Sequence, residues 1–262
     1  MRKIFVATIV TFIIRMAVFA NGTDVRLTDM DISEVRSNLL AFDKGRLSLE
    51  EVTERGGEEW GNKLTAYYEM YPDAVTIKMK LPISRCYAAM GKYSKAAALA
   101  NDYIGIYSND WHAWRIIGSA NIYMKDLAAA VHAYTNAVRL GDDGSCTALA
   151  YAATEIGRLD LVKEIVPRLF ILKESRPTQY IKPLDAVTVL VLYSLKSNQE
   201  KIFGEALQGV NASDILSRSD LEFLIKQGCE QFKGKDVDKI REELNAASGN
   251  SSKPSTTNAS SP

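Results

Sequence analysis

Residues 111–144 read WHAWRIIGSANIYMKDLAAAVHAYTNAVRLGDDG, and residues 77–110, directly before them, read IKMKLPISRCYAAMGKYSKAAALANDYIGIYSND. Both stretches are 34 residues long, and similar residue types recur at the same places in both. Gly91 coincides with Lys125 in a predicted turn, and Ala96 coincides with Ala130 in the helix that follows. A fixed period of this kind indicates a helical repeat.

Each stretch predicts two antiparallel helices joined by a short turn. One such pair cannot bury its apolar face alone, so successive pairs stack and share a core. Ala96 and Ala130 are expected where the two helices of a pair cross closely, and Gly118 is expected to let a neighbouring helix approach. Trp114 and Tyr134 are expected to fill the space between layers.

The two stretches resemble the tetratricopeptide repeat (TPR) family, in which a bulky residue and a Gly recur in the first helix and small and aromatic residues in the second. The residues that carry the resemblance are Ala113, Trp114, Ile117, Gly118, Leu127, Ala130, Tyr134, Ala137 and Val138 in the second copy and Ile83, Ser84, Tyr87, Gly91, Tyr93, Ala96, Ala100 and Tyr103 in the first. The resemblance implies an all-α, TPR-like α-solenoid of antiparallel helix pairs in a right-handed superhelix. Repeats of this kind bind other proteins and do not catalyse reactions.

The repeats are expected to extend on both sides of residues 77–144. Residues 21–76 predict N-terminal helices at 31–43 and 60–71, with a capping box at Ser48 and Glu51. Residues 41–74 fit a degenerate first repeat whose turn is disturbed by a Gly pair at 56–57.

Two prolines bear on the repeats at 77–174. Pro82 means that a helix begins there or is kinked, and Asp110 is expected to cap the next helix. A third copy starts near residue 143, about two residues early, and Pro167 predicts a bend or an early stop in its second helix.

The C-terminal helices are expected over residues 175–245. A connection at 175–183 leads to an apolar run at 184–195, which favours a buried helix over a strand and is too short to span a membrane. Further helices are predicted at 201–210, 221–232 and 236–244. The Ser-, Asn- and Thr-rich residues 246–262 predict a disordered tail.

The first 20 residues are typical of a secretory signal peptide. A basic start, an apolar run over 4–14 and small residues before Asn21 support cleavage there. Arg15 interrupts the apolar run, so an uncleaved anchor and a buried N-terminal helix remain alternatives. We expect an exported protein, periplasmic or secreted, with no membrane insertion beyond an N-terminal anchor.

Composition and motifs argue against several classes of function. Lys and Arg together number 32, as do Asp and Glu, so the zero net charge offers no strong field for nucleic acid. No nucleophile, phosphate-binding or His-Glu-x-x-His motif occurs, so neither an enzyme nor a cofactor is expected. Acid pairs such as Glu50-Glu51 and Asp142-Asp143 are expected to be solvated caps and turns.

Metal and disulfide chemistry are also disfavoured. His112 and His132 lie in different predicted helices, so no metal site is expected. Cys86, Cys146 and Cys229 cannot all pair, and buried thiols are favoured over a disulfide between two of them.

The candidate binding surface is the concave groove lined by the first helix of each pair. In this register its residues are Lys78, Arg85, His112, Arg115, Ser119, Tyr123, Tyr151 and Glu155. Arginines there can bind peptide carboxylates by paired hydrogen bonds, and tyrosines can supply contact area, although each residue also fits an ordinary polar face. TPR domains that clamp a chaperone's C-terminal carboxylate have polar residues where this chain has Leu81 and Ile116, so that ligand class is disfavoured.

These observations favour an exported scaffold or adaptor that captures a protein or peptide partner in the concave groove. The alternative is a structural subunit of an envelope or secretion assembly that uses its convex face and the apolar helix at 184–195. A third interpretation, an accessory domain of an enzyme, is disfavoured because the residues after the repeats lack clusters of His, Cys and Asp.

Overall fold

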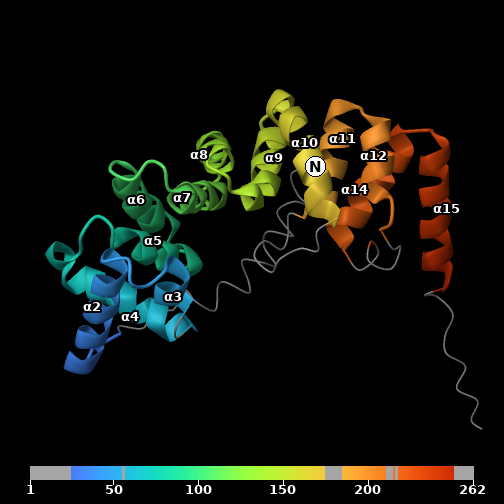
Figure 1. Ribbon diagram of the computed structural model, residues 1–262. Helices are drawn as coiled ribbons and strands as arrows, with labels where there is room; N and C mark the ends of the chain where they lie inside the picture. Colours follow the sequence, from blue (N-terminus) through green and yellow to red (C-terminus); the bar gives the residue numbers. More distant parts are fainter. Residues whose placement is uncertain (1–24, 55–56, 175–184, 211–214, 216–217, 251–262) are drawn as a thin grey trace, which may run out of the picture. The chain divides into compact units, whose positions relative to one another are not determined.

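The computed structural model describes residues 25–54, 57–174, 185–210, 215 and 218–250 (Figure 1). Within these ranges there are thirteen α-helices and no strands, and helices pack against their neighbours in the chain. The all-α prediction is therefore confirmed. The described residues fall into two compact units, 25–158 and 159–250, and each is described here by itself.

The N-terminal unit begins with three helices: α2 (Asp29–Asp43), α3 (Leu49–Glu54) and α4 (Gly57–Met70). The predicted capping box that starts α3 is present, since Glu51 accepts from the backbone of Ser48 at 2.7 Å and the hydroxyl of Ser48 accepts from the backbone of Glu51 at 3.1 Å. Helices α3 and α4 contact each other, as expected of a first pair. A short 3-10 turn, η2 (Pro72–Ala74), follows them.

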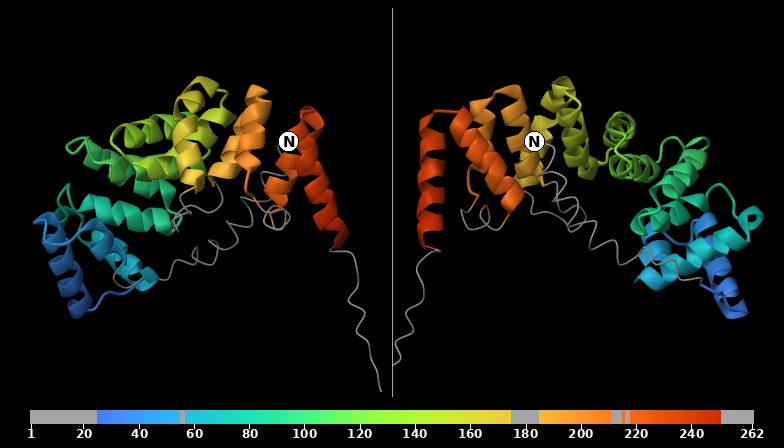
Figure 2. Two further views of the ribbon diagram at one scale, coloured as in Figure 1. Left: turned by 45° about the vertical axis from the view of Figure 1, so that its right-hand side comes forward. Right: turned by 180° about the vertical axis from the view of Figure 1, so that it is seen from behind.

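Two regular pairs come next. Their helices are α5 (Lys80–Ala89) with α6 (Tyr93–Ile104) and α7 (Trp111–Tyr123) with α8 (Leu127–Arg139). The turn η3 (Asp143–Ser145) then leads into α9 (Cys146–Glu155). Figures 1 and 2 show these helices following one another along the unit, and each contacts the next. In addition α3 contacts α5 and α5 contacts α7, so the first helices of successive pairs are adjacent.

The turns inside the pairs share one backbone geometry. Gly91, Lys125 and Gly157 all have positive φ angles, of 73°, 66° and 79°. In each turn this residue donates its N–H to the carbonyl three residues earlier, and the next residue donates to the carbonyl five residues earlier. This is the hydrogen-bond pattern of a left-handed helix end. The predicted equivalence of Gly91 and Lys125 is confirmed, although the same pattern also ends helices at Gly45 and Gly141 and so is not specific to the turns inside the pairs.

The first pair departs from this pattern at its turn. Gly57 has a φ of 59° and lies 34 residues before Gly91, but α4 begins at Gly57 itself. By contrast α6 begins two residues after Gly91. The irregularity expected at this glycine pair is therefore a helix that starts early.

Close packing of the second regular pair depends on Gly118. A Cβ atom added there would lie 2.9 Å from ring carbons of Tyr134, which is closer than packed side chains tolerate. Ala96 and Ala130 are fully buried at 0% exposure, as expected for close helix crossings. Trp114 is only half-buried, and its indole N–H donates to the carbonyl of Ser108 at 2.8 Å.

Helix ends follow the local sequence with one exception. Pro82 occupies the first turn of α5, where its missing N–H costs no helical hydrogen bond, and Asp110 caps α7 by accepting from the backbone of His112 at 2.9 Å. Pro167 was predicted to cause a bend or an early stop, and the early stop is wrong. Helix α10 (Leu159–Glu174) continues past this proline, and buried Ile165 and Leu169 anchor it on both sides.

The C-terminal unit is built around the apolar run. This run forms α11 (Ala186–Ser197), not a strand, and residues 188–194 are buried. Helix α11 contacts α10, α12 (Glu200–Leu207) and α14 (Ser219–Gln231). Lys173 of α10 donates to the carbonyls of Glu205 and Gln208, both at 2.8 Å, and so ties α10 to the end of α12.

The last helix, α15 (Lys235–Asn250), runs past residue 245, where we expected a disordered tail to begin. The rest of that tail and the predicted signal at 1–20 lie outside the described residues. In the described part of the chain, no helix combines the length and the apolar composition that crossing a bilayer requires.

Candidate partner-binding face

Five polar side chains form a connected group on the first helices of successive pairs. We call this group the polar face; it consists of Glu50, Glu54, Arg85, His112 and Arg115. Three of the five were predicted from the repeat register. The two glutamates were not, because short α3 does not follow that register.

Arg85 is held by α3. Its Nη1 donates to Glu50 Oε1 at 3.1 Å and its Nη2 donates to Glu54 Oε1 at 2.6 Å. Burial acts to raise the pKa of Glu50, but a hydrogen bond from its own backbone and the nearby charges of Arg85 and His112 outweigh it, so that this pKa lies below its usual value. The guanidinium predicted to bind a partner's carboxylate is thus occupied by two carboxylates of the chain itself.

His112 lies between the carboxylates of Glu50 and Asp110. Its Nδ1 is 2.9 Å from Asp110 Oδ1, and its Nε2 is 3.9 Å from Glu50 Oε1. The other oxygen of Asp110 accepts from the hydroxyl of Tyr103 at 2.8 Å. Although burial acts to raise the pKa of Asp110, the hydrogen bonds from His112 and Tyr103 lower it overall. This network ties the start of α7 to the end of α6 and brings His112 close to Glu50 of α3.

Arg115 has a different environment from Arg85. Its guanidinium lies over the ring of Trp111, 4.5 Å from the centroid, and the Trp111 ring also stacks on His112 at 3.5 Å. Its Nη1 is 3.5 Å from Oδ1 of Asp142. Asp142 is itself buried and accepts from the hydroxyl of Ser145 at 2.5 Å through its other oxygen. The Asp142-Asp143 pair was expected to be a solvated cap or turn; Asp142 does begin the η3 turn, but it is buried, so for this residue the prediction of solvation is wrong.

Three further predicted residues are partly exposed and also pack against neighbouring parts of the chain. Ser119 shares a hydrogen bond of 2.9 Å with the hydroxyl of Tyr134, and Tyr123 stacks on the ring of Tyr93 at 4.3 Å. Lys78 donates to the carbonyl of Asp43 at 2.7 Å and so binds α2.

Tyr151 was expected to offer contact area to a partner, and that prediction is wrong, since only 7% of it is exposed. Helix α9 is buried along residues 146–154, because its small and apolar residues occur on every side of the helix. Glu155 follows at the end of α9 and is partly exposed.

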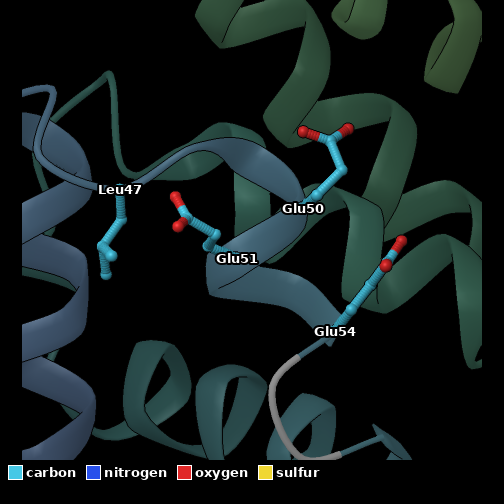
Figure 3. A pocket seen from close by; sticks show the side chains of 4 residues that line it. All are labelled: Leu47, Glu50, Glu51 and Glu54. Carbon is cyan, nitrogen blue, oxygen red and sulfur yellow. The ribbon is translucent and has the colours of Figure 1, made fainter.

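A hollow of about 470 Å³ lies beside the polar face and is lined by Leu47, Glu50, Glu51 and Glu54. Figure 3 shows Glu50 and Glu54 directed to one side of α3, whereas Glu51 turns toward Leu47. The carboxylates here outnumber the cations that pair with them. A partner approaching α3 therefore meets negative charge.

Neither metal nor disulfide chemistry is evident in the described residues. They contain no group of three His, Cys, Asp or Glu side chains that could hold a metal ion. All three cysteines are buried, and Cys86 and Cys229 are not disulfide-bonded. Burial raises the pKa of Cys86 to about 12.

This shift predicts that Cys86 is inert in the folded chain. Because the thiolate is the reactive form, raising the pKa above that of a free thiol lowers the reactive fraction at pH 8. We expect iodoacetamide to label Cys86 slowly in buffer and rapidly in denaturant, as read by peptide mass spectrometry. Equal labelling rates in the two conditions would contradict the buried position of this thiol.

No protein-family model matches the chain, and no curated protein matches its sequence.

Proposed function

We propose that this chain is an exported, TPR-like scaffold that binds an extended segment of another protein on its polar face. The observation that carries the proposal is the adjacency of α3, α5 and α7, the first helices of successive pairs. Because α5 contacts both α3 and α7, partly exposed polar side chains of successive pairs line one surface. Extended or helical peptides bind to surfaces of this kind through a few anchors.

The proposal assigns binding and no catalysis to the chain, and it requires no cofactor. Export rests on the N-terminal sequence alone. A partner in the periplasm or outside the cell follows from that expectation.

The alternative, a fixed subunit of an envelope or secretion assembly, relied partly on the apolar run 184–195 as an interface. Residues 188–194 of this run are buried against helices of their own unit, so they offer no surface to a partner. A fixed assembly would have to use other residues.

Site-specific photo-crosslinking in the native cells tests the proposal. A photoreactive phenylalanine analogue replaces Tyr123, which is partly exposed and lies eight residues after Arg115, on the same side of α7. In a matched control it replaces Arg139, which is exposed on α8. We expect one protein to be linked through Tyr123 and not through Arg139, with both variants unchanged in circular dichroism. Equal adducts at both positions, or none at Tyr123, would count against binding on this surface.

A further inference from the structure

Arg85 and Arg115 occupy corresponding surfaces of α5 and α7, but their exposure relative to their acidic partners is opposite. At Arg85 the carboxylates are the more exposed groups, since 51% of Glu50 and 47% of Glu54 is accessible against 23% of the arginine. At Arg115 the arginine side chain is 33% exposed and the Asp142 side chain only 6%. The more exposed partner of the ion pair is therefore acidic at Arg85 and basic at Arg115.

The guanidinium of Arg115 also has more N–H groups than its ion pair with Asp142 uses. A guanidinium carries five N–H groups, and among the described residues its carboxylate partner is a single oxygen at 3.5 Å, which is long for a hydrogen bond. Stacking on Trp111 holds the guanidinium plane without using its N–H groups. An arginine fixed in this way is prepared to bind a carboxylate through two parallel hydrogen bonds.

We propose that Arg115 binds a carboxylate of an acidic partner segment, and that Glu50 and Glu54 keep acidic residues of that segment away from α3. This inference rests on the proposed function and narrows it. It assigns the partner's chemistry, an extended segment with negative charge opposite α7. It also separates two arginines that were both predicted to bind a carboxylate of the partner.

The test uses the full chain and an array of short random peptides that range from net negative to net positive charge. Each acidic peptide is present with a free and with an amidated C-terminus, so that a terminal carboxylate is distinguished from a side-chain carboxylate. We expect the acidic peptides to bind best and to weaken as salt is added. The tightest one then serves as a fluorescent probe for the variants.

Four variants separate the roles. Arg115→Gln is expected to lower the affinity for the probe roughly tenfold, because one charge-assisted hydrogen-bond pair contributes about that factor. Arg115→Lys is expected to lower this affinity less, because lysine keeps the charge and loses only the planar guanidinium donors. Arg85→Gln is expected to weaken binding of the probe by less than Arg115→Gln does, because Arg85 makes no contact with the partner and its loss only leaves Glu50 and Glu54 without their cation. Glu50→Gln combined with Glu54→Gln is expected to strengthen binding of the acidic probe.

Several results would overturn the inference while leaving the proposed function intact. These are a Tyr123 cross-link together with no preference for acidic peptides, or equal losses from Arg85→Gln and Arg115→Gln. Failure of both the cross-link and the array would remove the proposed function as well. The melting temperatures of all variants show whether a loss of binding is caused by unfolding.

Discussion

Tyr134→Ala is expected to lower the free energy of unfolding of the N-terminal unit by about 3–5 kcal/mol, the usual cost of deleting a buried aromatic ring. Only 2% of Tyr134 is exposed, and its ring covers Gly118, where a Cβ atom would lie 2.9 Å away. The cavity would therefore be bordered by a residue that has no side chain to fill it. Denaturant unfolding of the full chain measures the loss, and hydrogen exchange in α7 and α8 locates it.

Two controls separate the ring from its hydroxyl. Tyr134→Phe keeps the packing and loses only the hydrogen bond to Ser119, so it is expected to cost about 1 kcal/mol. Gly118→Ala should destabilise the native chain but should recover stability in the Tyr134→Ala background, where space has opened. If Gly118→Ala costs the same in both backgrounds, the two residues do not pack as described.

Gly228→Ala is expected to destabilise the C-terminal unit by about 2 kcal/mol. The new Cβ would lie 2.0 Å from Cε2 of Phe203, so the ring or the helix must move. Phe203 is fully buried and packs on Phe232 with ring centroids 5.3 Å apart, which limits its escape. Overpacking of this kind costs about 3 kcal/mol, and the better helix propensity of alanine offsets about 1 kcal/mol.

A double variant with Phe203→Leu tests the cause. Leucine is smaller than phenylalanine, so the double variant is expected to lose less stability than the two single variants added together, with a coupling of about 1–2 kcal/mol. Thermal and denaturant unfolding of the full chain provide the three values. Strict additivity would show that the glycine is needed for some reason other than the Phe203 ring.

The repeat period predicted the backbone better than it predicted the surface. Gly91 and Lys125 were matched by spacing alone, and their φ angles agree to within a few degrees at 73° and 66°. A turn depends on local residues, so a periodic sequence determines it well. The helix in residues 184–195 was likewise predictable, since neighbouring helical patterns outweighed its β-branched residues.

The 34-residue repeat did not predict which side chains of the candidate site are paired and which are buried. Arg85 was identified correctly as a residue of the first helix of its pair, but its bonds to Glu50 and Glu54 depend on how irregular α3 packs against α5. The burial of Asp142 beneath Arg115 depends in the same way on the η3 turn. Only contacts between helices, which one sequence does not reveal, decide which charge of an ion pair faces the solvent.

The order of contacts in the N-terminal unit has a mechanical consequence. From α4 to α9 each helix touches the next along the chain, and the other contacts found there join near neighbours such as α5 and α7. Stretching such a unit by its ends breaks one helix interface at a time, so the force stays low over a long extension. Relaxation should re-form the interfaces in microseconds to milliseconds, because partners close in sequence find each other quickly. A unit built this way can yield under tension and then recover its shape.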